Sequence, residues 1–169
     1  HWDHTGGLSD LLQINPNINV VLLKETSEST KNIANKGKLI EISESKEIIE
    51  GVWSTGPLGT EIKEQSLVID TKKGMVILTG CSHPGITNIV RRAKEIFKKE
   101  IYLVMGGFHL LECLEPQLDK LKSIASELRE LGVKKIAPSH CTGKYPIEFF
   151  EKSFGNDFIR IGAGCLIKI

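Results

Sequence analysis

The chain has 169 residues, enough for one domain with a buried core, and its 40% hydrophobic and 25% charged residues are ordinary for a globular protein. Its formal net charge of +1 creates no overall field toward nucleic acid or an anionic membrane, and no apolar run approaches the ~20 residues of a membrane span. We therefore expect neither as a partner. The four cysteines lack C-x-x-C pairing and indicate a reducing, cytoplasmic compartment rather than a disulfide scaffold.

The first third of the chain predicts short elements. In order, they are a helix over 7–14, a strand over 19–23, a weak helix or a loop over 26–36, strands of a meander over 39–42 and 47–53, and a loop over 54–60 that contains Gly56-Pro57 and Gly59. That loop is either a plain connection or a flank of a substrate site, because binding residues often lie on loops.

The rest of the chain alternates strands and helices. The clearest hairpin joins 65–70 to 75–79, and its second strand is apolar enough to be central in a sheet. Then follow a helix over 86–97, a strand over 101–105, a long helix from near Pro116 to Gly132, a strand over 135–138, a helix over 147–154 and a broken terminal strand over 158–169. This order predicts an α/β layered fold.

The chain opens on a dense group of metal-ligand residue types, His1-Trp2-Asp3-His4, followed by two glycines. At a strand-to-loop exit these side chains would point into one site, and the glycines would let the backbone turn into the next helix. Imidazole and carboxylate ligands suit zinc, manganese or iron. The alternative is an accidental polar cluster.

The three later histidines, His83, His109 and His140, each follow an apolar run typical of a strand. Because the same ends of neighbouring parallel strands meet at one sheet edge, we expect these histidines to converge where α/β folds bind ligands. Cys81, close to His83, is either a metal ligand or a small buried hydrophobe. The helix after His83 would offer N–H groups to an anion such as phosphate.

Five ordered motifs carry a resemblance to a known family. They are HWDHTGGL at the start, EQSL at 64–67, TGCSHPG at 79–85, GGFHL at 106–110 and SHCTG at 139–143. Together they resemble the metallo-β-lactamase superfamily, marked by H-x-H-x-D-H, and its "superfamily II" branch of metal-dependent hydrolases. That branch includes an archaeal pterin-type synthase of methanopterin biosynthesis.

The resemblance implies an αβ/βα sandwich of the metallo-β-lactamase type with a metal site at one edge. It implies that residues 1–169 are the C-terminal portion of a single such domain, whose N-terminal part supplies the other half and the first motif histidine. It also implies two divalent metal ions. Zinc is the expectation, with manganese or iron as alternatives.

Ligand roles follow from the same resemblance. His1 and His83 would hold the first metal with the missing histidine, and Asp3, His4 and His140 would hold the second. Cys81 stands where many members have a bridging aspartate. Either its thiolate is a ligand, or His83 and water bridge the metals.

Two residues are expected to act on the reaction itself. Asp3 would orient the attacking water or receive its proton, besides binding metal. His109 would bind substrate or donate a proton to the leaving group, the alternative being a structural histidine. The implied activity is hydrolysis of a phosphorylated or ester-bearing small molecule. The alternatives are a pterin-type transferase, in which an aryl amine displaces diphosphate at the same metal site, and a non-catalytic or degenerate metal-binding domain.

Overall fold

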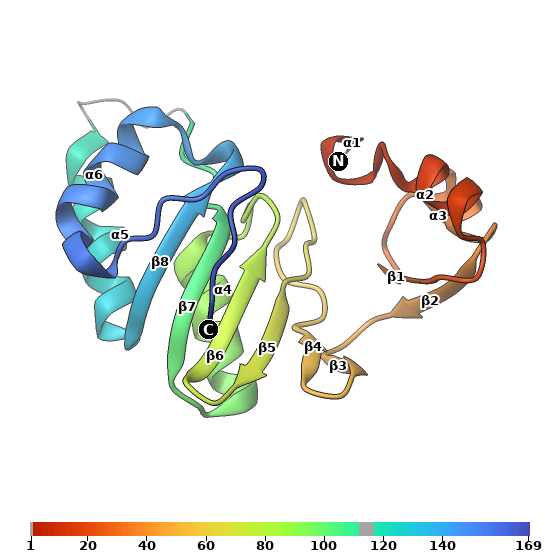
Figure 1. Ribbon diagram of the computed structural model, residues 1–169, viewed down its shortest axis with the longest axis horizontal. Helices are drawn as coiled ribbons and strands as arrows, with labels where there is room; N and C mark the ends of the chain where they lie inside the picture. The colour runs from red at the N-terminus through yellow and green to blue at the C-terminus, as the bar shows by residue number, and fades with distance from the viewer. Residues whose placement is uncertain (1, 112–116) are drawn as a thin grey trace.

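The computed structural model describes residues 2–111 and 117–169, which form one large sheet with helices and one smaller lobe (Figure 1). The large sheet has the strand order β3-β4-β5-β6-β7-β8. Neighbours from β3 to β6 are antiparallel, whereas β6, β7 and β8 are parallel. Its strands are β3 (Lys46–Ile49), β4 (Val52–Ser54), β5 (Leu67–Thr71), β6 (Gly74–Thr79), β7 (Ile101–Gly107) and β8 (Val133–Ser139). The predicted α/β class is confirmed.

The centre of the sheet is the predicted hairpin β5–β6 and the two parallel strands beyond it. Met75, Val76 and Ile77 of β6 are almost completely buried, as expected of a strand covered on both faces. Parallel neighbours require a crossover, and helices α4 (Ile86–Phe97) and α5 (Leu118–Glu130) provide it between β6, β7 and β8. Pro116, predicted near the start of the second helix, lies outside the described residues, as does Cys113.

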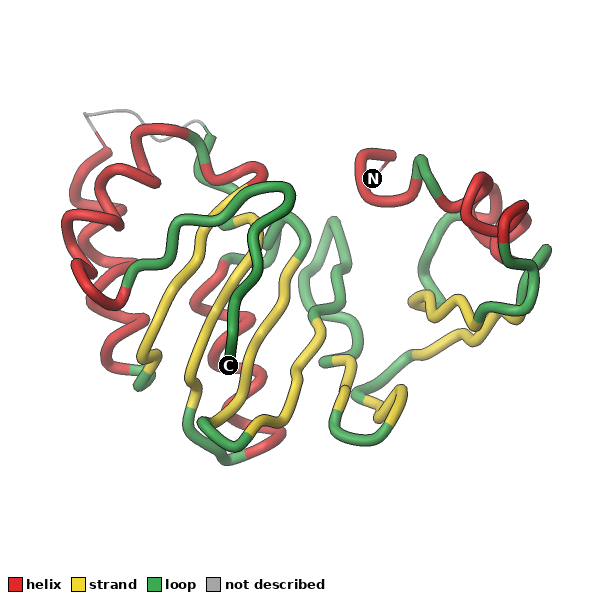
Figure 2. The backbone as a smooth tube through the Cα atoms, viewed as in Figure 1, coloured by secondary structure: helices red, strands yellow, loops and turns green. Residues whose placement is uncertain are grey.

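Helices α4, α5 and α6 (Lys144–Phe154) cover one face of the large sheet (Figure 2). The apolar stripe predicted for α4 is the buried one: Ile86, Ile89, Val90 and Ala93 face the sheet. Leucines of α5 and phenylalanines of α6 complete this core. This layer of helices supports the strands whose upper ends in Figure 1 carry the loops.

The C-terminal segment packs on the opposite face of the sheet and does not add a strand to it. The strand predicted over 158–169 is wrong, because beyond the short helix η3 (Gly155–Asp157) only Phe158 forms a bridge, to Ile136. A turn from Gly162 to Cys165 breaks the segment. The isoleucines that suggested a strand, Ile159, Ile161 and Ile167, instead pack on Val76, Leu103 and Ala137 of the sheet.

The smaller lobe is a parallel pair of strands with two helices, α2 (Leu8–Ile14) and α3 (Glu28–Ala34). Strand β1 (Asn19–Leu23) pairs in parallel with β2 (Lys38–Ile42), and α3 is the crossover between them. The ambiguous stretch over 26–36 is therefore helical, and Ser27 caps it by accepting the Thr30 N–H. Leu12, Val20 and Ala34 form the small core of this lobe.

The predicted meander is wrong in two respects. Strand β2 leaves the large sheet and pairs only with β1 among the described strands. The single strand predicted over 47–53 is a tight hairpin, β3–β4, because Gly51 takes φ +74° at its turn. Apolar side chains lie on both sides of that turn, and periodicity alone does not reveal it.

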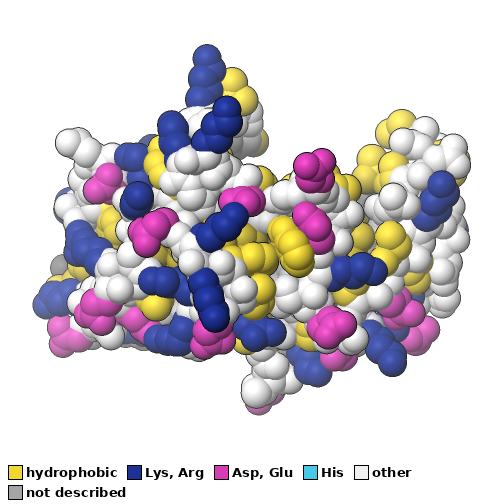
Figure 3. Space-filling model, turned by 90° about the horizontal axis from the view of Figure 1, so that it is seen from below, with side chains coloured by type: hydrophobic (Ala, Val, Ile, Leu, Met, Phe, Trp, Pro, Cys, Tyr) yellow, Lys and Arg dark blue, Asp and Glu magenta, His cyan; other side chains and the backbone are white. Residues whose placement is uncertain are grey.

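The face at the amino ends of the parallel strands carries interspersed basic and acidic side chains (Figure 3). No helix within residues 2–111 and 117–169 combines the length and the apolar character needed to cross a membrane. The carboxyl ends of the same strands carry the motifs, and the register pairs Thr79 with Gly106 and Gly107 with Ser139. Residues that follow these strands therefore emerge side by side.

Candidate metal centre

Close backbone packing brings the three strand ends together. A Cβ on Gly107 would lie 2.5 Å from the Gly80 carbonyl oxygen and 2.7 Å from the Cys141 sulfur, so a larger residue would force these neighbours to shift. Gly80 in turn lies against the His4 ring, because a Cβ at Gly80 would be 3.3 Å from His4 Cε1. The glycines of the TGCSHPG and GGFHL motifs thus let the loops approach one another.

The first group of possible ligands contains Asp3, His4, Cys81 and His140, whose ligand atoms all lie within 4.8 Å of one another. Cys81 Sγ is 3.0 Å from His4 Nε2 and 3.3 Å from His140 Nε2. Asp3 Oδ2 is 3.2 Å from His140 Nε2 and 3.5 Å from His4 Nε2. Cys81 is buried, whereas Asp3, His4 and His140 are exposed on one side.

Two of the candidate metal ligands near the start of the chain lie on a helical turn. Asp3 and His4 lie in α1 (Trp2–Thr5), not at the strand-to-loop exit that we expected. Trp2 accepts a hydrogen bond from Gly6 N–H through its carbonyl, which closes the turn. His1, expected to be a ligand of the first metal, lies outside the described residues.

A second group contains Cys81, His83 and His109, with ligand atoms again within 4.8 Å of one another. The rings of His83 and His109 lie 4.2 Å apart between centroids and are tilted by 47°. Cys81 is a member of both groups, so they are contiguous. His109 is exposed and lies beside His83.

Glu64 is a site residue to which the sequence reasoning assigned no role. Its carboxylate forms a very short contact with His83 Nδ1 and accepts the His83 backbone N–H at 3.1 Å. A carboxylate bound to one ring nitrogen fixes the tautomer and turns Nε2 outward, as in many metal sites. Its motif, EQSL, was the available signal, but nothing in it links residue 64 to residue 83.

Burial is the main factor that raises the pKa of the Cys81 thiol, to about 12, and the neighbouring Cys141 acts in the same direction. Without a cation the thiol therefore keeps its proton at neutral pH. A coordinated divalent metal reverses this preference, since it stabilises the thiolate directly. The buried-hydrophobe and ligand interpretations of Cys81 are thus compatible in one structure.

Strained backbone also gathers at this edge. Ser82, His109 and His140 have φ values of 64°, 51° and 50°, a region that side chains other than glycine rarely occupy. Each follows or ends one of the three parallel strands. Hydrogen bonds hold the first of them: Ser82 Oγ donates to the Gly107 carbonyl at 2.5 Å and lies 2.9 Å from Thr79 Oγ1. Such strain is concentrated at functional sites, where the surrounding structure stabilises it.

The first group fits a divalent transition metal. Zinc ligands lie 2.0–2.3 Å from the ion, so tetrahedral ligand atoms are about 3.3–3.8 Å apart. The four distances here, 3.0, 3.2, 3.3 and 3.5 Å, approach that spacing. The donor set of two imidazoles, a carboxylate and a thiol matches the borderline-soft preference of zinc or iron better than that of magnesium.

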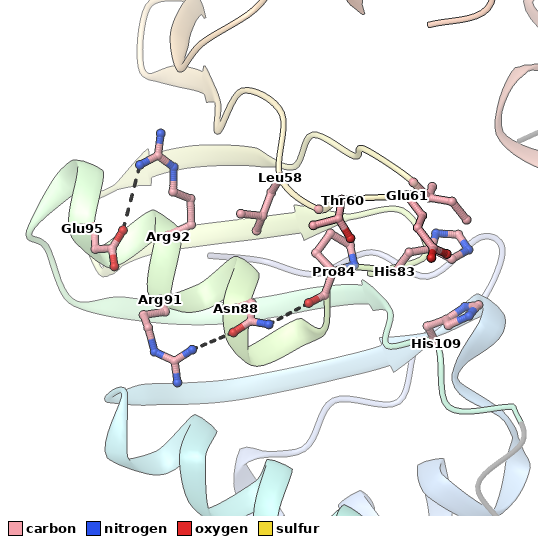
Figure 4. Close-up of a pocket in the computed structure, with 12 residues that line it drawn as sticks. Leu58, Thr60, Glu61, His83, Pro84, Asn88, Arg91, Arg92, Glu95 and His109 are labelled. Carbon is pink, nitrogen blue, oxygen red and sulfur yellow. Dashed lines mark hydrogen bonds and ion pairs between the residues drawn. The ribbon is translucent and has the colours of Figure 1, made fainter. Parts of the chain in front are cut away.

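A groove of about 700 Å³ opens beside the second group (Figure 4). His83 and His109 stand at one end, and the loop residues Leu58 and Thr60 form one wall. The loop over 54–60, for which two interpretations were open, therefore flanks a cavity next to the histidines. A smaller cavity of about 240 Å³ is lined by residues that include His4 and Cys81.

No known protein-family model matches the chain. Among curated proteins, 7,8-dihydropterin-6-methyl-4-(β-D-ribofuranosyl)-aminobenzene-5'-phosphate synthase of Methanocaldococcus jannaschii is 42% identical over 106 residues, which are 62% of this chain and 35% of that protein. An uncharacterized protein of the same organism is 37% identical over 68 residues, 40% of this chain and 24% of its own. The chain thus spans between a quarter and about a third of the length of these relatives.

Two solved structures share the fold. A metal-dependent hydrolase of the β-lactamase superfamily superposes with a TM-score of 0.85 at 29% identity, over 100% of this chain and 76% of the other. An isothiocyanate hydrolase from Delia radicum gut bacteria reaches a TM-score of 0.52 at 13% identity, over 89% and 67% of the two chains, and shows the fold alone. The resemblance carried by the motifs is confirmed: the chain has the fold of the metallo-β-lactamase superfamily and is similar in sequence to a pterin synthase.

Proposed function

We propose that this chain carries the metal site of a hydrolase that attacks a phosphorylated or ester-bearing small molecule. One observation carries the proposal: Asp3, His4, Cys81 and His140, up to 137 positions apart, present four ligand atoms within 4.8 Å of one another. Cysteine sulfur, histidine nitrogen and aspartate oxygen are the atoms that bind zinc in proteins, usually four of them in a tetrahedral arrangement. The similarity to a metal-dependent hydrolase supports the same conclusion.

The proposed ligands fall into the two groups. Asp3, His4 and His140 would hold one zinc ion, with Cys81 as a fourth or bridging ligand. His83, oriented by Glu64, would hold a second ion together with His1 and a histidine from a preceding segment, as the family resemblance implies. We propose on the same grounds that residues 1–169 are the C-terminal portion of one domain.

The residues of the chain have distinct tasks in this proposal. When bound, a divalent cation lowers the pKa of water to about 7 and offsets negative charge that develops on the substrate. The exposed Asp3 carboxylate accepts the proton released by the attacking group. His109, at the mouth of the groove, donates a proton to the leaving group from its exposed ring. Cys81 and Glu64 stay buried or half-buried and hold the imidazoles in place.

The test uses the full-length protein, the Asp3→Asn variant and a control, Asp10→Asn, on the exposed surface of α2. Zinc per chain is measured by atomic emission, and hydrolysis is followed with para-nitrophenyl phosphate and para-nitrophenyl acetate. We expect Asp3→Asn to lose most of its zinc and its hydrolysis of at least one ester, while the control keeps both. Wild-type protein that binds no zinc, manganese or iron would refute the proposal and leave the non-catalytic alternative.

A transferase that uses an amine in place of water is the second candidate. The observation that favours it is the 42% identity to the synthase over 106 residues of this chain. The same site serves both reactions, because only the attacking group differs. Incubation with a pterin diphosphate, with and without an aryl amine, separates them: release of diphosphate that depends on the amine identifies the transferase, and release of inorganic phosphate, or of diphosphate without the amine, identifies the hydrolase.

A further inference from the structure

The groove beside the second histidine group runs away from the metal centre along α4 (Figure 4). His83 and His109 lie at one end of it, and Arg91, Arg92 and Glu95 lie at the other. The metal centre explains the histidine end. It does not explain why the groove continues to a pair of arginines.

The arginine end belongs to one stripe of α4. Arg91 and Arg92 lie three and four residues after Asn88, Glu95 lies four and three residues after them, and all four line the groove. The opposite stripe of the helix is buried in the core. Since α4 rises 1.5 Å per residue, Arg92 lies about 9 Å along the helix axis from Ile86, the first helical residue after His83, Pro84 and Gly85. The groove therefore suits an elongated ligand rather than a single small ion.

The two arginines differ in their partners. Arg91 Nη1 donates to Asn88 Oδ1 at 2.7 Å, and its Nη2 pairs at very short range with the Glu127 carboxylate of α5. Arg92 Nη1 stands 4.0 Å from the Glu95 carboxylate, beyond hydrogen-bond distance. Both side chains of this second pair are exposed, at 39% for Arg92 and 62% for Glu95. Such a pair contributes about 0–1 kcal/mol, so an incoming anion can displace Glu95.

We propose that Arg92 binds a carboxylate or phosphate at the far end of the substrate, at the opposite end of the groove from His83 and His109. The planar guanidinium presents parallel N–H donors that match two oxygens of such an anion. Leu58 and Pro84 line the groove between the two ends and would contact an apolar middle part of the substrate. This inference rests on the function proposed above and specifies its substrate class: an elongated small molecule with an anionic end.

The experiment measures binding by calorimetry to zinc-loaded full-length protein. The probes are an alkylphosphonate with a carboxylate at its other end, at least about 9 Å away, an alkylphosphonate of the same length with a neutral end, and phosphonoacetate, which is too short to span the groove. A phosphonate at the metal centre is common to all three. We expect the long dianionic probe to bind about tenfold more tightly than the neutral-ended one, as one charge-assisted pair allows.

Two substitutions are expected to change the affinity for the dianionic probe in opposite directions. This distinguishes a binding role of Arg92 from a purely structural one. Arg92→Gln should abolish the tenfold advantage of the dianionic probe and leave the neutral-ended probe unchanged. Glu95→Gln should tighten the dianionic probe by about two- to threefold, because it removes a competing carboxylate. Arg160→Gln, at a surface arginine paired with Glu151 outside the groove, is the matched control and should change nothing.

The outcomes distinguish the two proposals. If the long probes bind equally tightly, or if Glu95→Gln weakens the dianionic one, the arginine subsite is refuted while the metal centre stands. If no phosphonate binds the zinc-loaded protein, both proposals fail. A carboxylate-ended and a phosphate-ended version of the long probe, compared side by side, then show which anion Arg92 prefers.

Discussion

Glu64 makes a sharp test, because its carboxylate contacts His83 twice while belonging to neither ligand group. We predict that Glu64→Gln weakens zinc binding. The native carboxylate accepts from the ring nitrogen Nδ1 and from the backbone N–H of His83, the latter at 3.1 Å. An amide has one oxygen for these two donors and turns its NH₂ toward the other, so one charge-assisted contact is lost and the ring is no longer fixed.

The expected size of the effect follows from that geometry. Loss of such an outer contact costs about 10- to 100-fold in metal affinity, or about 1.4–2.7 kcal/mol. Zinc affinity is measured by competition with a chromophoric chelator, and the melting temperature of the metal-free protein is measured in parallel. Glu100→Gln, an exposed glutamate before β7, is the control. An unchanged zinc affinity in Glu64→Gln, with the fold intact, would refute the role of Glu64 in orienting His83.

Three further predictions follow from the same geometry. His83→Ala and His140→Ala should each abolish activity and lower metal content, measured as zinc per chain; either variant with full zinc contradicts the ligand assignment. His109→Ala should lower kcat by about 10²-fold or more while zinc stays bound, as loss of a proton donor predicts; loss of zinc would instead make His109 a ligand, which its distance to His83 and Cys81 permits. Gly107→Ala should destabilise the protein by about 1–3 kcal/mol in urea unfolding, because its Cβ would meet the Gly80 carbonyl and the Cys141 sulfur, whereas Gly162→Ala, with open space around it, should be neutral.

Local patterns predicted the central part of the fold well. The hairpin β5–β6, the crossover helix α4 and the strands β7 and β8 each bury a continuous apolar run or stripe, and such periodicity is visible in sequence. Since parallel strands end at one edge, the approach of Cys81, His83, His109 and His140 to one another could also be anticipated. This prediction follows from the geometry of parallel sheets and not from any property of histidine.

The predictions that were wrong depend on which segments contact one another in the fold. Strand β2 has the apolar content of a strand, but nothing local indicates that it pairs in parallel with β1 instead of continuing into β3. The terminal isoleucines suit either an edge strand or a covering segment, and only the open face of β6–β8 decides between them. The role of Glu64 could not be predicted for the same reason. Its contact with His83 joins residues 19 positions apart and depends on the path of the loop between them.

The division into two lobes has a consequence for how the protein is held together. Asp3 and His4 come from the lobe built on β1 and β2, whereas Cys81 and His140 come from the large sheet. Polar contacts between the two parts include the Gln65 side chain donating to the Val21 carbonyl at 3.2 Å and the ion pair of Lys63 with Glu25 at 2.8 Å. A cation bound by these four side chains would crosslink the two lobes. It would therefore stabilise the folded protein as well as take part in the reaction.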